Sequence, residues 1–115
     1  MDNLRKILEI GKNCSSRGNG ESLGQLLIQA NYLSERKKLQ ASDLADRIRS
    51  CPKYINEWIA YSEDKRTTGG WYLLNTGEIG QVLKENTKIQ FDSIEEAVSE
   101  FVVRELDFWA QRQSA

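Results

Sequence analysis

Residues 54–91 read YINEWIAYSEDKRTTGGWYLLNTGEIGQVLKENTKIQF, and two different periodicities meet within them. The first part has apolar residues at helical spacing, with Ile55, Trp58 and Ile59 on one face. Gly69-Gly70 ends this helical part, because paired glycines favour a turn. The second part is aromatic and apolar with turn residues at short intervals, which is typical of strands. The segment therefore predicts a helix followed by a small antiparallel sheet.

Three short strands are expected in the second part, at residues 71–74, 79–83 and 88–91. The first two are joined by a hairpin turn in which Gly77 can adopt a positive φ. Gly80 lies inside the second strand, where a glycine indicates a bulge or a close backbone approach. The expected sheet is a three-stranded antiparallel meander.

Four helices are expected before the sheet in the sequence, at residues 3–10, 22–33, 42–50 and from Pro52 onward. A fifth is expected after it, from residue 93 to the C-terminal part of the chain. Ser42 is the predicted N-cap of the third helix. Ser93 and Glu96 form a predicted capping box at the start of the last helix, in which each side chain bonds the other residue's backbone N–H. We expect residues 1–115 to be a single α+β domain: N-terminal helices, the meander, and a C-terminal helix packed on the sheet.

Composition narrows the function classes. A chain of 115 residues that is 39% hydrophobic and 29% charged is typical of a soluble globular domain. The net charge of −1 gives no reason to expect nucleic acid as a partner. No run approaches the ~20 apolar residues of a membrane span, and the N-terminus lacks the apolar core of a signal peptide. We therefore expect no membrane association and a cytoplasmic location.

Metal and cofactor chemistry finds no support in the sequence. The chain has no histidine, which is the commonest general base and zinc ligand. Its two cysteines, Cys14 and Cys51, are widely separated and are expected to be reduced thiols. No glycine-rich phosphate-binding motif or nucleophile-elbow motif is present. We expect no cofactor, no metal and no catalytic residue.

Charge is distributed unevenly along the chain. Residues 1–66 contain 12 Lys or Arg and 9 Asp or Glu, whereas residues 67–115 contain 4 and 8. The acidic excess is concentrated in and before the last predicted helix, at Asp92, Glu95, Glu96, Glu100, Glu105 and Asp107. This pattern indicates either a solvated helix face or a negative surface for a basic partner.

Glu105 falls inside the apolar stripe of the last helix, between Phe101 and the pair Phe108-Trp109. A carboxylate at such a position must reach solvent, be paired or be protonated. Three interpretations follow: a side chain bent out to water, a structural ion pair with Lys65 or Arg66, or a catalytic carboxylate. The ion pair would join the last helix to the charged segment.

The charged segment, residues 62–66, combines both signs at close quarters. It is interpreted either as a solvated run that ends the helix or as a recognition surface. In the second case Arg66 would lie beside exposed aromatic side chains, Tyr61 and Tyr72, which are residue types that interfaces favour. The three tryptophans, Trp58, Trp71 and Trp109, are expected in the core.

A family resemblance covers residues 51–106. Trp58, then YSEDKR at residues 61–66, then GWYL at residues 70–73, resembles small bacterial immunity proteins of the contact-dependent growth inhibition type. FVVREL at residues 101–106, on a capped helix after a strand, is similar to the closing helix of such proteins. The resemblance implies a cytoplasmic protein without enzymatic activity that binds and blocks one cognate toxin domain. Contact residues are not shared across such families, so none is assigned by resemblance.

We therefore expect a non-enzymatic protein-binding module whose partner is a toxin domain. Many such toxins are nucleases with basic clefts, which an acidic surface would complement. The candidate acidic contacts are Glu95, Glu96, Glu100 and Asp107. The alternative is a small enzyme or ligand-binding regulator with a pocket near Glu105, Arg66 and Tyr72. A pocket with convergent polar groups would favour that alternative, and a flat or convex acidic surface would favour the binding module.

Overall fold

The computed structural model describes residues 5–10, 32–64, 70–82 and 84–113. Residues 5–10 are helical, and the labelled elements follow in chain order. They are α3 (Tyr32–Glu35), α4 (Ala41–Ser50), α5 (Lys53–Asp64), β1 (Trp71–Leu73), β2 (Glu78–Gln81), the 3-10 turn η1 (Glu85–Thr87), β3 (Ile89–Gln90) and α6 (Ile94–Gln113). The helix predicted from residue 22 lies, up to residue 31, outside the described residues.

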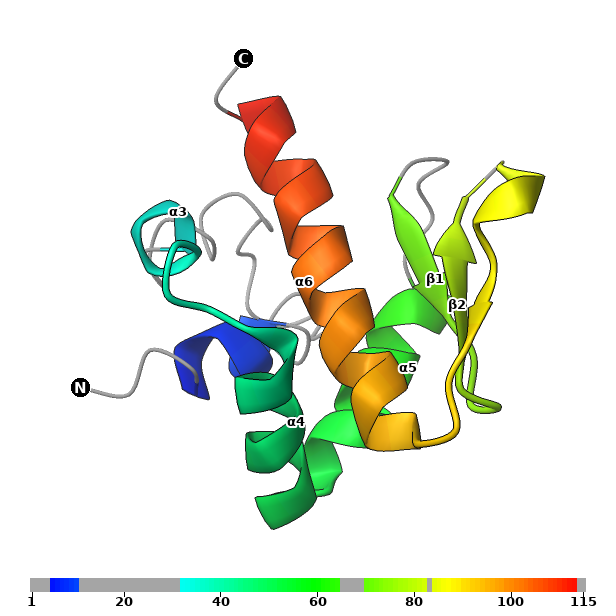
Figure 1. The fold of residues 1–115 in the computed structure, drawn as a ribbon, viewed down its shortest axis with the longest axis horizontal. Coiled ribbons are helices and arrows are strands. Elements are labelled where there is room, and N and C mark those ends of the chain that lie inside the picture. The colour runs from blue at the N-terminus through cyan, green and yellow to red at the C-terminus, as the bar shows by residue number, and fades with distance from the viewer. Residues whose placement is uncertain (1–4, 11–31, 65–69, 83, 114–115) are drawn as a thin grey trace.

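Helix α6 occupies the middle of the molecule. Figure 1 shows α6 crossing the centre, with α4 on one side and the sheet on the other. The helix contacts α4, α5, β1 and β2. The prediction of an α+β fold with a C-terminal helix against the sheet is therefore confirmed, and the same helix also forms the core with α4 and α5.

The sheet has the predicted antiparallel order β1-β2-β3. Leu73 pairs with Ile79, and Ile79 pairs with Ile89, so these three side chains share one face. Leu73 and Ile79 are buried in the core, and Ile89 packs against it. Gly77 in the first hairpin turn has a φ of 92°, which confirms the need for glycine there.

The two predicted helix starts have different outcomes. Helix α4 begins at Ala41 after an N-cap residue, Gln40, that makes no side-chain capping bond, so the predicted cap at Ser42 is wrong. The N-cap of α6 is confirmed, because the Ser93 hydroxyl accepts the backbone N–H of Glu96 at 3.3 Å. The Ser93 hydroxyl in turn donates to Glu95 at 2.7 Å. The reciprocal bond predicted for the Glu96 carboxylate is replaced by a contact with Arg49.

Helix α5 buries a different face from the predicted one. Its core residues are Tyr54, Trp58 and Tyr61, whereas Ile55 and Ile59 are only half-buried. Tyr61 is 4% exposed, so the prediction that it is an exposed recognition residue is wrong. Its ring and that of Trp58 meet edge to face with centroids 5.2 Å apart. Such a contact adds to the stabilisation from buried aromatic area.

Only one of the three tryptophans is fully in the core. Trp58 is 0% exposed and its ring also meets Phe101 edge to face. Trp71 and Trp109 are half-buried and pack against the edge of the core. The expectation of three core tryptophans is therefore right for Trp58 only. Trp71 and Trp109 are half-buried, and each donates an N–H group to a hydrogen bond with Glu105.

Candidate functional site

Glu105 is fully buried and joins three elements. Its Oε2 accepts the Tyr61 hydroxyl at 2.6 Å and the Trp109 indole N–H at 2.9 Å. Its Oε1 accepts the backbone N–H of Trp71 at 2.7 Å. Three donors from α5, α6 and β1 therefore converge on one carboxylate, which is how a buried acidic group is stabilised without reaching water.

The bond from Trp71 also satisfies an edge of the sheet. Trp71 and Leu73 occupy the positions of β1 whose N–H groups point away from β2 in this register. The Leu73 N–H donates to the Ser62 hydroxyl of α5 at 2.8 Å. Side chains of two helices thus take the place of a further strand, which protects an edge that could otherwise pair with another chain.

The burial of Glu105 excludes one of its three interpretations. The interpretation that its side chain bends out to solvent is wrong, since the residue is 0% exposed. The predicted partners Lys65 and Arg66 lie outside the described residues, so the ion pair stays a prediction. The contacts described above give Glu105 a structural role, and the catalytic interpretation stays a prediction.

Asp107 does not belong to an open acidic surface. Its carboxylate accepts the Tyr32 hydroxyl at 2.7 Å and receives the Arg36 guanidinium at 2.8 and 3.0 Å. Burial, and then the bond to Asp107, hold the pKa of Tyr32 above its ordinary value. The Asp107 carboxylate thus joins α3 and the turn after it to α6, and with its side chain 28% exposed its role as a partner contact stays a prediction.

Tyr72 lies on the sheet face opposite Leu73. Its ring crosses Gly80, its partner in β2, and a Cβ atom at Gly80 would come within 2.6 Å of that ring. The sequence predicted a bulge or a close backbone approach at Gly80; the group that lies close to Gly80 is instead the Tyr72 side chain. The Tyr72 hydroxyl donates to Glu78 at 2.7 Å, and burial followed by this bond raises the pKa of Tyr72 to about 12. Tyr72 is half-buried, so it is not the exposed aromatic that was predicted.

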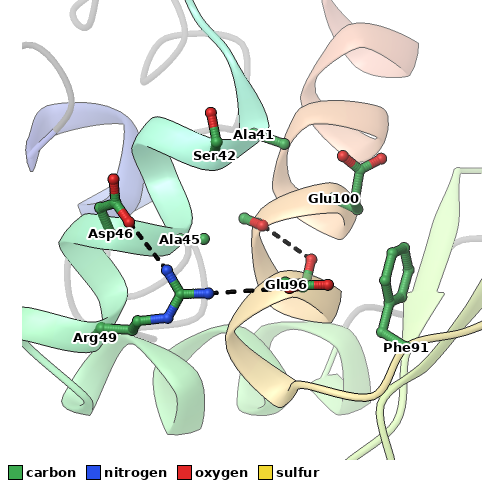
Figure 2. Close-up of a pocket in the computed structure, with 9 residues that line it drawn as sticks. Ala41, Ser42, Ala45, Asp46, Arg49, Phe91, Glu96 and Glu100 are labelled. Atoms are coloured by element: carbon green, nitrogen blue, oxygen red, sulfur yellow. Dashed lines mark hydrogen bonds and ion pairs between the residues drawn. The ribbon is translucent and has the colours of Figure 1, made fainter.

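A surface cavity of about 240 Å³ opens between α4 and α6. We call it the α4–α6 notch. It is lined by residues of α4, of α6 and of the segment before α6, namely Ala41, Ser42, Ala45, Asp46, Arg49, Phe91, Glu96, Ser99 and Glu100. Figure 2 shows the α4 side chains on one side of Glu96 and Phe91 on the other. Ser99, buried at 1% exposure, lines it as well and donates its hydroxyl to the Glu96 carbonyl at 2.8 Å.

The charges lining the notch are mainly negative. Asp46, Glu96 and Glu100 line it together with one base, Arg49. The Arg49 guanidinium lies 2.9 Å from Asp46 and 4.0 Å from Glu96, so its closer partner is the α4 carboxylate. Glu100 pairs with Arg104, one turn further along α6, at 3.3 Å. The net charge of the lining favours a cationic group.

Glu95 borders this region at the start of α6. The Ser93 hydroxyl, then its own backbone N–H, and more weakly Arg49, hold the pKa of Glu95 below its ordinary value. Glu95 is therefore ionised throughout the neutral range. It adds negative charge beside the notch without being one of its lining residues.

The structure brings together only part of the predicted site. Glu96 and Glu100 lie in one notch with Glu95 nearby, whereas Asp107 and Tyr61 are used inside the fold and Tyr72 lies on the sheet. Arg66 lies outside the described residues. The sequence reasoning missed Asp46, Arg49 and Phe91. For Asp46 and Arg49 the only signal was an acidic and a basic residue at helical spacing, which is common on exposed helices.

Within residues 5–10, 32–64, 70–82 and 84–113, no group of three His, Cys, Asp or Glu side chains is placed to hold a metal ion. In those same residues no helix combines the length and the apolar character needed to cross a bilayer. The Cys51 thiol is free and half-buried, and Cys14 lies outside this part.

Comparison of the chain with protein-family models, with curated proteins and with solved structures finds no match. Support for a function therefore comes from the geometry and charge of the notch and from the sequence resemblance.

Proposed function

We propose that this chain is a non-enzymatic protein-binding module that binds and blocks a toxin domain in the cytoplasm, as immunity proteins of the contact-dependent growth inhibition type do. The α4–α6 notch and the acidic start of α6 form the contact surface. The toxin domain presents a basic surface to them, such as the cleft of a nuclease, and occupation of that surface excludes its substrate.

The observation that carries the proposal is the accessibility of the carboxylates at the notch. Side chains of Asp46 and Glu96 are 78% and 52% exposed, and Glu100 is 30% exposed. Exposed acidic groups contribute little to folding, since surface ion pairs stabilise by only ~0–1 kcal/mol. Carboxylates placed around a concave surface instead accelerate association with a basic partner and select against acidic ones.

The alternative, a small enzyme or ligand-binding regulator, was expected to use a pocket with convergent polar groups near Glu105, Arg66 and Tyr72. The notch is a concave surface with polar lining residues, which counts toward that alternative, but Glu105 and Tyr72 do not line it. Glu105 is buried among structural donors, and Tyr72 projects from the opposite face of β1 to the one that packs on α6. These two residues therefore do not converge on one pocket. The notch lies elsewhere and has neither of them in its lining.

The proposal is tested by growth rescue. The candidate toxin domain is the C-terminal domain encoded by the neighbouring open reading frame, expressed alone in a bacterial host. We expect it to arrest growth, and co-expression of the present chain to restore growth and yield a one-to-one complex on size-exclusion chromatography. Arrest that persists despite full expression of the chain, with no complex formed, would contradict the proposal.

A toxin domain inactivated at its own catalytic residue is the matched control. It should bind the chain without arresting growth, which separates binding from rescue. A toxin domain from an unrelated locus should arrest growth and not be rescued, because immunity depends on a specific interface.

A further inference from the structure

We infer that the α4–α6 notch is a receptor for a single arginine side chain, whose guanidinium group lies between Glu96 and Glu100. In the cell this arginine belongs to the toxin domain, and to that extent the inference rests on the proposed function. The site itself is defined by the chain's own residues and is tested without the toxin.

The size of the notch fits a side chain. Its volume of about 240 Å³ is below the roughly 300–1,000 Å³ of pockets that hold small-molecule ligands. At ~30 Å³ for each water molecule it has room for roughly eight waters. An extended side chain entering from a partner surface displaces such a number of waters.

Two carboxylates are available to a cation at the notch. Glu96 and Glu100 are four residues apart on α6, so their side chains are neighbours on one face. Each uses its Oε1 in a described ion pair, with Arg49 and Arg104 respectively. Within the described part of the chain, no hydrogen bond is donated to Oε2 of either residue. Like charges at this spacing repel, and a cation between them relieves the repulsion.

Among the described residues, Arg49 and Arg104 each pair with one of the two glutamates, and none of the described basic residues is paired with both. Arg49, the base that lines the notch, is bound to Asp46 at 2.9 Å and approaches Glu96 only to 4.0 Å. Arg104 lies with its guanidinium 5.1 Å from the centre of the Trp71 ring, a contact with β1. Arg49 is therefore held mainly by Asp46, and Arg104 bonds Glu100 from the side of β1, so an incoming guanidinium would be a second cationic partner for Glu96 and Glu100.

The remaining walls match the rest of an arginine side chain. Phe91 provides an aromatic ring beside Glu96, and Ala45 with Ala41 provides an apolar wall on α4. An aliphatic stem packs on such a wall, and a planar guanidinium interacts with an aromatic ring. Arginine is preferred to lysine because its fork of donors can bond two separate carboxylates at once.

The direct test is a titration of the purified chain with N-acetyl-arginine methylamide, followed by backbone amide chemical shifts at low salt. The matched probe is N-acetyl-citrulline methylamide, which has the same shape and no charge. We expect saturating shifts at Ala45, Phe91 and Ser99 with the arginine derivative, and at least tenfold weaker binding of the citrulline derivative. Equal affinities, or shifts elsewhere than around the notch, would overturn the inference.

Two variants localise the site by independent means. Glu100→Gln removes one charge at constant volume and should weaken binding of the arginine derivative roughly fivefold, as expected for a surface ion pair. Ser42→Trp fills the notch from an exposed position and leaves the charges in place, and it should abolish binding. The control is Asp43→Asn, an exposed carboxylate of α4 that does not line the notch. Unchanged affinity in both test variants would exclude the site.

The outcomes separate this inference from the proposed function. If the toxin domain is bound and neutralised while the arginine derivative does not enter the notch, the receptor is wrong and the proposed function stands. If the derivative binds at the notch but no toxin complex forms, the receptor stands and the proposed function is wrong.

Discussion

The backbone N–H of Trp71 donates a 2.7 Å hydrogen bond to the side-chain carboxylate of Glu105. This bond joins the first residue of β1 to the fully buried face of α6, across 34 positions of sequence. The same carboxylate accepts Tyr61 and Trp109, so the relative placement of α5, β1 and α6 depends on one charged group. The placement of α6 in turn fixes where Glu96 and Glu100 lie.

Replacing Glu105 by glutamine should therefore destabilise the fold strongly. The amide has one oxygen instead of two and introduces an N–H₂ donor among the Tyr61, Trp71 and Trp109 donors. We expect the free energy of unfolding to fall by about 2–4 kcal/mol, the range for breaking a buried charged hydrogen-bond group. Chemical denaturation measures it. The matched control is Glu100→Gln on the exposed side of the same helix, and an equally small effect in both variants would refute the structural role.

Gly80→Ala should displace the Tyr72 ring. The new methyl group would lie 2.6 Å from ring atoms at the far end of that side chain, so the ring must move and its bond to Glu78 must break. We expect a loss of about 1–2 kcal/mol in the free energy of unfolding. In a Tyr72→Ala background the same substitution should cost clearly less, because the clash is gone. Additive effects of the two substitutions would contradict the contact.

Asp107→Asn should loosen α3 from α6 without changing the partner surface. Its carboxylate accepts both Tyr32 and Arg36, and an amide can keep only some of these bonds. We expect the free energy of unfolding to fall by about 1–2 kcal/mol, since these bonds are charged and partly buried. Asp46→Asn, at a 78% exposed side chain, is the control and should be nearly neutral. Comparable stability of the two variants would refute this role of Asp107.

The titration of Glu95 tests the start of α6. Because the pKa of Glu95 is lowered in the folded chain, the unfolded chain binds this proton more readily than the folded chain. The resulting stabilisation is present above the ordinary pKa of 4.5 and is lost as pH falls through the lowered value.

Side-chain carboxyl shifts against pH measure that pKa directly. We expect a value below 4.5 in the wild type and a return toward 4.5 in Ser93→Ala, while Ser93→Thr keeps the hydroxyl and most of the shift. A wild-type value at or above 4.5 would contradict the bond between Ser93 and Glu95.

Local patterns in the sequence predicted the order of the elements but not how residues distant in sequence meet. The turn at Gly77 and the cap at Ser93 each depend on neighbours within a few positions, and both are confirmed. The need for a glycine at position 80 was read from the strand, but the group close to it is the Tyr72 side chain and not the predicted backbone. The buried face of α5 was predicted from its isoleucines. Tyr61 lies on the buried face instead, because its hydroxyl has a buried acceptor in Glu105 that no local pattern reveals.

The candidate site shows the same limit. Glu96 and Glu100 were predicted from the charge of one helix, whereas the notch exists only because α4 places Ala45, Asp46 and Arg49 opposite them. Asp107 was assigned to the same acidic face on helical spacing alone. Its true partners, Tyr32 and Arg36, are more than 70 positions away, so charge along the chain could not distinguish an internal ion pair from an open carboxylate.

The central claim is that the acidic notch is the surface through which this chain binds a basic partner. The measurement is the association rate with the toxin domain of the neighbouring reading frame, as a function of salt, for the wild type and for Glu96→Lys/Glu100→Lys. A second variant, Asp43→Lys/Glu63→Lys, makes the same change of net charge at exposed positions outside the notch.

We predict that the wild-type rate falls as salt is raised and that the notch variant associates at least tenfold more slowly at low salt, within the range of electrostatic steering. The second variant should lose much less, and both should unfold within ~1 kcal/mol of the wild type, apart from the contribution of Glu96 near the start of α6. Equal association rates for the wild type and the notch variant at low salt would contradict the claim.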